Sequence, residues 1–570
     1  MLLNAIVIGT YFLFLISIGV IFKRLNRDEE DYFKSGARCS WWMVGMSLLM
    51  SGISTQTFVA NAGVAYNAGF SIYWVYIINA LCATVLALGL AAWYRQARVT
   101  TFAEMVRGRF GGSFEQLFTY YNIVWLIIGG SIGLVMLALF TRTVFGLPLP
   151  FTIIALGVVL LFYTLTGGNW AVMAASFLQG LVLFSMSILL GILCLKHIGG
   201  IGAFFSAIHA QGLANDFRMM TPCRPDGLYG IEWLLGVGII QVYAALGMQG
   251  GQRFFSCKDG REAKKAAWFY VVLGLIGMMV YFIPPMVARL MYADEISAMA
   301  VQSPADLSFS FMSLKLLPFG FVPLMLVAMF SAQMSTMDTA LNANAALFVT
   351  NAYPALMRRM KKEPRTDHKF LLALGRVFNV LLGAALIGFA LWFAANLNDK
   401  GIFELTFRIN AILGIPLLMP LFLGFYIRRT PLWSGWFCFG VALTCSVICS
   451  SIGLPSYRLA LINSGAGLIA FLSTTLFWNR VPETTHTHLK EFFTRLHTPV
   501  DFEQEVGDAN DGLQLKLVGI LAISLGGFIL FFLLLPNDVG ARFCIFSVAS
   551  AILGVGAVLY GLSKKRSINS

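Results

Sequence analysis

The sequence contains little charge for its length. Only 12% of its 570 residues are Asp, Glu, Lys or Arg, whereas 58% are hydrophobic, and the mean hydropathy is +0.77. Soluble globular domains carry about twice that share of charge. The composition therefore indicates an integral membrane protein, and it excludes a soluble enzyme, a nucleic-acid binder and a single-anchor receptor with a large ectodomain.

Motifs for metals and nucleotides are also absent. The nine Cys are scattered without disulfide or metal spacing, and the sequence has no GxxxxGK[ST], HExxH or CxxC. All six His are expected in loops between apolar runs, which argues against a haem or copper centre inside the membrane. Because no ATP site is seen, transport by this chain would depend on an ion gradient.

Apolar runs of helical length predict an all-α polytopic membrane protein with about fifteen transmembrane helices. Each span needs about 20 apolar residues, so fifteen spans leave little room for a soluble domain. The expected spans cover residues 2–22, 41–66, 70–94, 116–140, 150–166, 170–194, 231–251, 267–291, 317–350, 370–394, 402–427, 432–453, 458–479, 515–535 and 541–562.

Most Lys and Arg fall in loops on one side of this pattern. The positive-inside rule then places the N-terminus outside and the C-terminus in the cytoplasm of a multi-pass protein of the cell inner (plasma) membrane. The net charge of +13 is explained by this topology, and no nucleic-acid partner is expected. The first run lacks a basic leader and a small-residue cleavage site, so a retained helix is expected rather than a signal peptide.

Polar residues inside the apolar runs are the informative ones, because each is costly to place in a membrane. The second span contains a run of small and hydroxyl residues from Ser51 to Thr57, including Gly52. Such a run is typical of a discontinuous helix whose freed carbonyls bind a cation. Close packing of neighbouring helices is the alternative explanation.

A second polar cluster lies in the ninth span. On a helix, Ala332, Ser335 and Thr336 share one face, so one carbonyl and two hydroxyls can approach the same point. These hard oxygen ligands suit sodium, although Ser and Thr also bond back to the preceding helical turn without any ligand. Asp338 follows, either as a salt bridge or cap near the cytoplasmic side or as a proton carrier.

The eleventh span holds Glu404, Arg408 and Asn410 near its outer end. Glu404 and Arg408 are four residues apart and can pair on one helix face. A structural ion pair or gate and a clamp for a charged solute are both compatible with this spacing.

At this point the sequence resembles the sodium:solute symporter family over residues 5–480. No single motif is decisive, but the ordered set is specific. The motifs are Asp31-Tyr32-Phe33 with Gly36 and Trp41-Trp42, Gly63-Val64-Ala65-Tyr66 with Gly69, Thr101-Phe102-Ala103-Glu104-Met105 with Arg109-Phe110-Gly111, Gly167-Gly168 with Ala171-Val172 and Gln179, Gln252-Arg253-Phe254, and Met334-Ser335-Thr336.

The resemblance implies a core of five plus five helices related by an inverted repeat, each half opened by a broken helix. It implies the following organisation: a first helix and loop (1–40), a ten-helix core (41–430) with repeats 41–194 and 231–427, two further helices (431–480), a cytoplasmic loop (481–514), and two last helices with a short tail (515–570). The acidic stretch 481–514 is expected to be a solvated linker, with a docking segment as the alternative.

The resemblance also implies the binding residues. The family's sodium site falls on the backbone carbonyls of Met50, Ile53 and Ala332 and the hydroxyls of Ser335 and Thr336, and its aromatic inner gate falls on Tyr243. The solute is expected near the bilayer midplane. The residues expected around it are Thr57, Tyr76, Gln241, Tyr243 and Phe407.

Departures from the family pattern refine this expectation. Ala175-Ser176 replaces a Thr-Asp pair of many members, so one sodium per cycle is expected. Thr57 and Tyr76 stand where the sugar carriers have a glutamine and a glutamate, which argues against a glucose-like binding mode. Glu404, Phe407 and Arg408 also replace the amides and acid of those carriers.

The sequence thus predicts a sodium-coupled symporter that takes up a small polar organic solute by alternating access, with a sugar or sugar derivative as first choice. No catalytic residue and no cofactor other than the sodium ion are expected. Partners are the solute and the lipid bilayer, and the sequence does not predict an oligomeric state. Two alternatives stay open: a proton-coupled symporter of an amino acid or organic acid, and a membrane-embedded transferase or hydrolase using Asp338 or Glu404.

Overall fold

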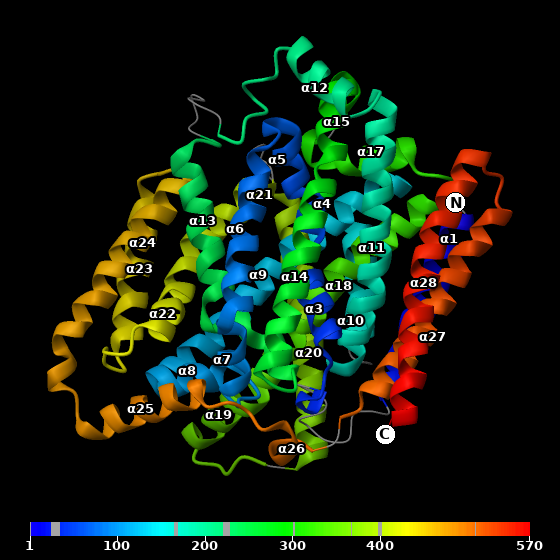
Figure 1. Ribbon diagram of the computed structural model, residues 1–570. Coiled ribbons are helices and arrows are strands. Elements are labelled where there is room, and N and C mark those ends of the chain that lie inside the picture. Colours follow the sequence, from blue (N-terminus) through cyan, green and yellow to red (C-terminus); the bar gives the residue numbers. More distant parts are fainter. Residues whose placement is uncertain are drawn as a thin grey trace.

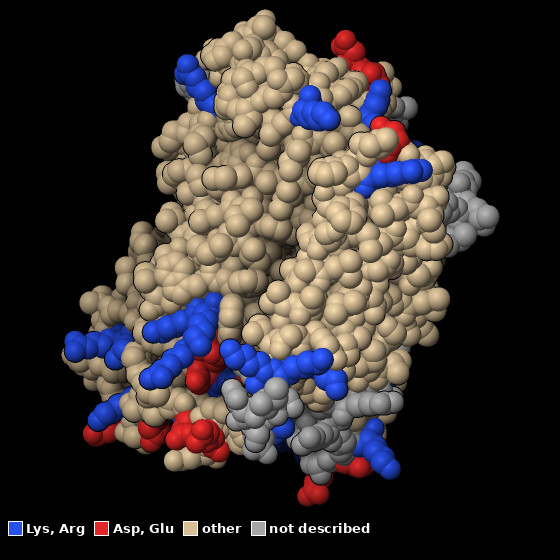
Figure 2. Space-filling view, turned by 45° about the vertical axis from the view of Figure 1, so that its right-hand side comes forward, with Lys and Arg blue, Asp and Glu red and all other residues tan. Residues whose placement is uncertain are grey.

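The structure is a computed structural model that describes residues 2–23, 35–164, 169–220, 228–299, 303–365, 367–396, 402–507 and 509–569. Helices form the regular structure of these residues, and an isolated parallel bridge pairs Cys39 with Cys257. Most helices run side by side between the two ends of the molecule (Figure 1). Lys and Arg gather at these ends and leave a broad uncharged band between them, as expected of a bilayer-spanning protein (Figure 2).

Eleven helices in the described part of the chain are long and apolar enough to cross a membrane, and a bent pair, Trp41–Gly52 with Thr55–Ala68, makes a twelfth. The expected spans 2–22, 150–166 and 317–350 coincide with helices whose apolar parts are shorter, namely Gly9–Phe22, Leu149–Phe162 and Phe321–Met334. The all-helical polytopic fold is therefore confirmed with eleven to twelve candidate spans, and fifteen stays a prediction.

The expected first repeat, residues 41–194, contains the broken span and the helices that follow it along the chain. Its elements are α3 (Trp41–Gly52), α4 (Thr55–Phe58), α5 (Ala60–Ala68), α6 (Ser71–Val85), η2 (Leu86–Leu90), α7 (Ala91–Gln96), α8 (Phe102–Phe110), α9 (Gly112–Phe145), α10 (Leu149–Thr164) and α11 (Asn169–Ile198). A capping box starts α8, because the Thr101 hydroxyl accepts from the Glu104 N–H and the Glu104 carboxylate accepts from the Thr101 N–H.

The expected second repeat, residues 231–427, follows a short helix, α12 (Ile201–Ala210). Asp259 caps α14 by accepting a hydrogen bond from the Glu262 N–H at 2.8 Å. The elements are α13 (Ile231–Leu246), η3 (Met248–Ser256), α14 (Gly260–Tyr281), α15 (Ile283–Met291), α16 (Ala293–Ser297), η4 (Pro304–Leu307), α17 (Ser308–Leu316), α18 (Phe321–Leu347), η5 (Phe348–Ala352), α19 (Tyr353–Arg359), α20 (His368–Ala395), α21 (Ile402–Ile409), η6 (Asn410–Gly414) and α22 (Ile415–Tyr426).

The remaining helices lie around this core. They are α1 (Leu2–Lys23), α23 (Ser434–Ser451), α24 (Ser456–Ser473), η7 (Thr474–Arg480), α25 (Glu483–His497), α26 (Phe502–Glu505), α27 (Asp511–Leu530), η8 (Phe531–Leu534) and α28 (Val539–Asn569). Helices α27 and α28 form a hairpin at one edge of the molecule and contact α11 (Figure 1). Gly519 and Gly556 let the backbones of this hairpin touch, since a Cβ at either would lie 2.8 Å from a backbone nitrogen of the other helix.

The stretch 481–514 is more ordered than a solvated linker. Its helix α25 carries Leu489, Phe492, Phe493 and Leu496, which are spaced as one helical stripe and are buried. The stripe packs against α7 and α8. All six His were expected in loops, and that expectation was wrong. Each belongs to a helix: His197 to α11, His209 to α12, His368 to α20, and His486, His488 and His497 to α25.

Candidate functional site

The second span is broken at Ile53 and Ser54. Helix α3 ends at Gly52, and both following residues have extended backbone angles before α4 begins at Thr55. The axis bends by 50° across this break. Because residues 53 and 54 leave the helix, the carbonyls of residues 50–52 lose their usual helical partners, whereas the Leu49 carbonyl still accepts from the Ile53 N–H at 2.9 Å. The discontinuity predicted from Gly52 and its hydroxyl neighbours is present.

The break lies against α18, the helix that carries the second polar cluster. The Thr55 hydroxyl donates a hydrogen bond to the Gln333 side-chain oxygen at 2.7 Å and reaches the Gly133 carbonyl of α9 at 3.2 Å. A Cβ on Gly133 would collide with the Gln333 amide. These contacts bring α4, α9 and α18 together, so the two clusters that were separate in sequence become neighbours.

A cavity of about 320 Å³ opens beside this junction. Its lining includes Ser51, Ser54 and Gln56 from the broken span and Gln333 and Thr336 from α18. The Thr336 hydroxyl lies 3.2 Å from the Ala332 carbonyl, to which it donates a hydrogen bond. Two oxygens of the predicted sodium set therefore lie close together on the helix that borders the break.

The other members of that set are placed by the backbone alone or lie outside the described part. Met50 and Ile53 have buried side chains and contribute carbonyls at the end of α3. The side chains of Ser335 and Asp338 lie outside the described residues, as do residues 31–33 and 167–168 of the family motifs. Without a described Ser335 hydroxyl, the completeness of the site stays a prediction.

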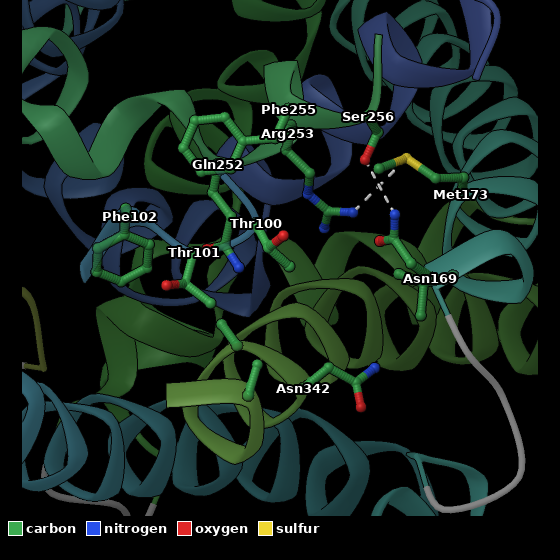
Figure 3. A pocket seen from close by; sticks show the side chains of 13 residues that line it. Thr100, Thr101, Phe102, Asn169, Met173, Gln252, Arg253, Phe255, Ser256 and Asn342 are labelled. Atoms are coloured by element: carbon green, nitrogen blue, oxygen red, sulfur yellow. Dashed lines mark hydrogen bonds between the residues drawn. The ribbon is translucent and has the colours of Figure 1, made fainter. Parts of the chain in front are cut away.

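A smaller cavity of about 30 Å³, roughly one water in size, shares Phe102, Gln252 and Ala343 with the larger one. Figure 3 shows Arg253 extending toward Met173 in this cavity, while the Asn169 amide donates to the Ser256 hydroxyl. Arg253 also donates to the Ser51 hydroxyl at 2.9 Å. A buried guanidinium thus connects η3 to the end of α3, a contact that the motif residues Gln252-Arg253-Phe254 did not reveal.

Two predicted solute residues lie together on the far side of the break. The Tyr76 hydroxyl donates to the Thr57 hydroxyl at 3.2 Å and accepts from the Asn61 amide at 2.9 Å. Asn61 was not predicted as a solute residue, although its spacing of four residues from Thr57 places both on one helix face. A cavity of about 40 Å³ adjoins this network, bordered by Ile53, Tyr76 and the unpredicted Tyr270 and Tyr281.

The other predicted solute residues are not brought to these cavities. Tyr243 packs on Phe422 of α22 with ring centroids 5.2 Å apart, and Phe407 lies 6.3 Å from the Trp233 ring. Neither they nor Gln241 are among the lining residues of the three cavities described above. In this conformation Tyr243 and Phe407 are engaged in these aromatic contacts, away from Thr57 and Tyr76.

Glu404 of the third cluster is engaged outside the core, because it accepts a hydrogen bond from the Ser456 hydroxyl of α24. Arg408 is half-buried one turn further along α21. Sequence spacing alone suggested a mutual pair, whereas the structure shows that α24 also holds Glu404.

A buried carboxyl that sequence reasoning missed lies in η4. Asp306 is 4% exposed, and its Oδ2 atom accepts a hydrogen bond from the Ile402 N–H at 3.2 Å. Its Oδ1 atom occupies the space where a side chain on Gly63 would begin. Burial raises the pKa of this carboxyl to about 7. Asp306 thereby joins the start of α21 to α5, and no apolar or motif pattern in its loop pointed to it.

Comparison with known proteins identifies the architecture. Residues 32–436 match the sodium:solute symporter family. The chain belongs to this family. It is a sodium-coupled solute symporter and a multi-pass membrane protein rather than an enzyme, which removes the transferase or hydrolase alternative.

Two sodium cotransporters are similar to this chain at low sequence identity. The chain is 26% identical over 469 residues to the sodium/glucose cotransporter 2 of Rattus norvegicus, covering 75% of this chain and 68% of the relative. It is 26% identical over 461 residues to the sodium/myo-inositol cotransporter 2 of Sus scrofa, covering 74% and 66%. The matched regions therefore span about two thirds of the length of these relatives.

A solved structure of a substrate-bound, outward-open Na+-coupled sialic acid symporter has the same fold. The TM-score is 0.69 at 19% identity, and the match covers 84% of this symporter and 98% of the solved chain. Membership of the sodium:solute symporter family makes sodium a co-substrate of this symporter together with a small-molecule solute.

Proposed function

We propose that this symporter takes up a small polar solute of the sugar or polyol class, driven by one sodium ion per cycle. The observation that carries the proposal is the break at Ile53 and Ser54, which lies beside α18 where the Ala332 and Thr336 oxygens meet. The sodium ligands are the carbonyls of Met50, Ile53 and Ala332 and the hydroxyls of Ser335 and Thr336.

The solute would lie across the break from the large cavity. The Thr57, Asn61 and Tyr76 network offers hydroxyl and amide groups, which suit a polyhydroxylated ligand better than a charged one. Gln241, Tyr243 and Phe407 join this site when α13 and α21 move toward α5 during alternating access. The named relatives, a glucose and a myo-inositol cotransporter, support the same solute class.

The proposed membrane arrangement follows from charge. The end that carries α7, α8 and α25 faces the cytoplasm of the plasma membrane, with the N-terminus outside and α3 to α22 forming two inverted repeats of five helices. One sodium ion that enters down an inside-negative membrane potential of about 100 mV supplies about 2.3 kcal/mol. That free energy supports roughly 50-fold accumulation before any chemical gradient is added, so one ion is sufficient.

Sodium binding is tested by thermal unfolding of the purified symporter in detergent, with sodium, potassium or choline at equal ionic strength. Sodium should raise the midpoint, because a ligand at 100 times its Kd stabilises the native state by about 2.7 kcal/mol. Ser335→Ala and Thr336→Ala should lose this effect. Thr350→Ala is the matched control, since its exposed hydroxyl bonds only to the Ala346 carbonyl on the same span.

The midpoints could instead be equal in sodium and potassium and depend on pH in a way that Asp338→Asn abolishes. That result would contradict sodium binding and favour proton coupling. The solute is then sought by adding glucose, myo-inositol or sialic acid to the sodium-bound protein. Because coupling between two ligands is reciprocal, the correct solute should also lower the apparent Kd for sodium. Tyr76→Phe should weaken the solute effect while leaving the sodium effect intact.

A further inference from the structure

A cavity remote from the transport path lies at the end of the molecule that carries α7, α8 and α25. It has a volume of about 570 Å³. One wall is the connection between α22 and α23, which contributes Arg428 and Arg429, and the other is α25, which contributes Lys490 and Phe493. Trp478 of η7 lines it as well.

Both walls are held in place by the core. Figure 1 shows α25 lying across this end of the bundle, and its Phe492 ring packs 2.8 Å from the position of a Cβ on Gly108. The buried Arg109 guanidinium donates to the Gly424 carbonyl at 2.8 Å, to the Ile427 carbonyl at 3.1 Å and to the Thr430 hydroxyl. The connection that presents Arg428 and Arg429 is therefore fixed to α8 on both sides of the two arginines.

The cavity concentrates positive charge. Arg428, Arg429 and Lys490 are exposed, and none of the lining residues, all within the described part of the chain, is a carboxylate. In the acidic segment after α25, Glu505 is already paired with Arg98 at 2.7 Å. Three cations around one hollow repel each other unless an anion lies between them.

The Arg428 side chain is oriented by His497. The Arg428 Nη2 atom lies 3.2 Å from His497 Nε2, and His497 Nδ1 lies 2.6 Å from the Phe493 carbonyl. Since a guanidinium can only donate, Nε2 accepts and the Nδ1–H donates. The remaining N–H groups of Arg428 stay available to a ligand in the cavity, with the guanidinium 5.2 Å from the Phe493 ring centre.

The surroundings place the cavity at the level of lipid headgroups. Trp433, Trp436 and Phe477, which adjoin its walls in sequence, are between 42% and 45% exposed. Tryptophan rings are typical of membrane–water interfaces. In Figure 2 the lower edge of the molecule carries Lys and Arg directly beneath the uncharged band. A ligand there can keep a charged group among the cations and apolar chains along the band.

We propose that this cavity binds the phosphate group of an anionic phospholipid, with Arg428, Arg429 and Lys490 as donors and Trp478 and Phe493 against the glycerol region. Arg supplies paired donors that match phosphate oxygens. The proposal does not depend on which solute the symporter carries. It makes α25 an interfacial helix that fixes an anionic lipid between its exposed face and the α22–α23 connection.

The test uses the purified full-length symporter in detergent, titrated with dioctanoyl phosphatidylglycerol, dioctanoyl phosphatidylcholine or inorganic phosphate. Lipid adducts are counted by native mass spectrometry and the thermal midpoint is recorded in parallel. Phosphatidylglycerol should bind more tightly than phosphatidylcholine, by about fivefold for each cation that contacts it. The double variant R428Q/R429Q should therefore weaken phosphatidylglycerol by about 25-fold and leave phosphatidylcholine unchanged.

The control K564Q/K565Q removes two exposed cations from α28 at the same end of the protein and should keep wild-type affinity. Two single variants of α25 repeat the comparison: Lys490→Gln removes a cation that lines the cavity, and Arg495→Gln removes an exposed cation that does not. Equal binding of both lipids, or equal losses in the paired variants, overturns the proposal. Protection by inorganic phosphate at the same concentration also overturns it, in favour of a soluble anion.

Discussion

The Thr55 hydroxyl donates a hydrogen bond to the side-chain oxygen of Gln333, at 2.7 Å, across 278 residues of sequence. Thr55 is the first helical residue after the break, and Gln333 follows Ala332 on α18. The bond therefore sets the distance between the two helices that carry the proposed sodium ligands. Both side chains are buried, so neither can exchange its partner for bulk water.

Thr55→Val should destabilise the protein. The substitution preserves shape but leaves the Gln333 oxygen and the Gly133 carbonyl without this donor, and an unsatisfied buried group costs about 1–3 kcal/mol. Thermal unfolding in detergent measures the loss, with Thr84→Val as control because its hydroxyl serves only the Ala80 carbonyl one turn away. An equal midpoint for the two variants would show that the contact contributes nothing.

Gly63→Ala should also be destabilising, by about 1–3 kcal/mol, because the new Cβ collides with the Asp306 carboxylate. Gly388→Ala is the matched control. Gly388 lies on an exposed face of α20 with nothing within 4 Å of the added carbon, so alanine there should be neutral or stabilising. Combining Gly63→Ala with Asp306→Ser should recover part of the lost stability, because the shorter side chain leaves room for the new Cβ. If stability is not recovered, the clash is not with Asp306.

Asp306→Asn should change how stability depends on pH. Burial raises the pKa of this carboxyl to about 7 in the native state, above the ordinary value of 3.8. The native state therefore holds a proton that the unfolded chain has released, and Asp306 makes the protein less stable as pH rises from about 4 to about 7.

The Asn variant is free of this cost. The free energy of unfolding of the Asn variant should exceed that of the wild type by an amount that grows between about pH 4 and about pH 7. The difference should reach at most about 4 kcal/mol and stay constant at higher pH. Midpoints of both proteins, measured between pH 5 and 8, test the slope, with Asp538→Asn removing an exposed carboxyl as the control. A difference that does not change with pH would contradict the assignment.

Arg109→Lys should lower the thermal midpoint as strongly as a neutral residue at position 109, although lysine keeps the positive charge. One ammonium cannot reach the Gly424 carbonyl, the Ile427 carbonyl and the Thr430 hydroxyl together, and each bond from a charged donor contributes about 1.5–3 kcal/mol. The control is Arg107→Lys, whose side chain is 68% exposed. Similar midpoints for both variants would mean that the connection after α22 does not need Arg109.

Much of the membrane fold could be predicted because apolar length and inserted polar residues are local signals. Gly52 and the hydroxyl residues after it located the break within two residues, and the family motifs led to the correct family. The spacing of Ala332, Ser335 and Thr336 pointed to α18, the helix that packs against the break. These features need no knowledge of distant packing.

What the sequence could not indicate depends on packing between distant segments. The resemblance placed Tyr243 and Phe407 near the solute, which stays a prediction, but it gave no sign that their rings pack on Phe422 and Trp233. Asp306 lies in the short helix η4, and no sequence pattern indicates its burial against Gly63 and Ile402. Helix α25 was missed because four apolar residues in an otherwise charged stretch form too short a stripe to stand out.

The break at Ile53 and Ser54 has a consequence for how this protein can vary. Oxygens that belong to the main chain are supplied by every amino acid, so the proposed ligand positions Met50, Ile53 and Ala332 can exchange side chains of similar volume and keep their carbonyls. Selection would act there on shape, whereas hydroxyl positions would tolerate only serine or threonine. Divergent members with the same ion requirement would then look unrelated at most ligand positions, and only the kink in the helix would reveal their common chemistry.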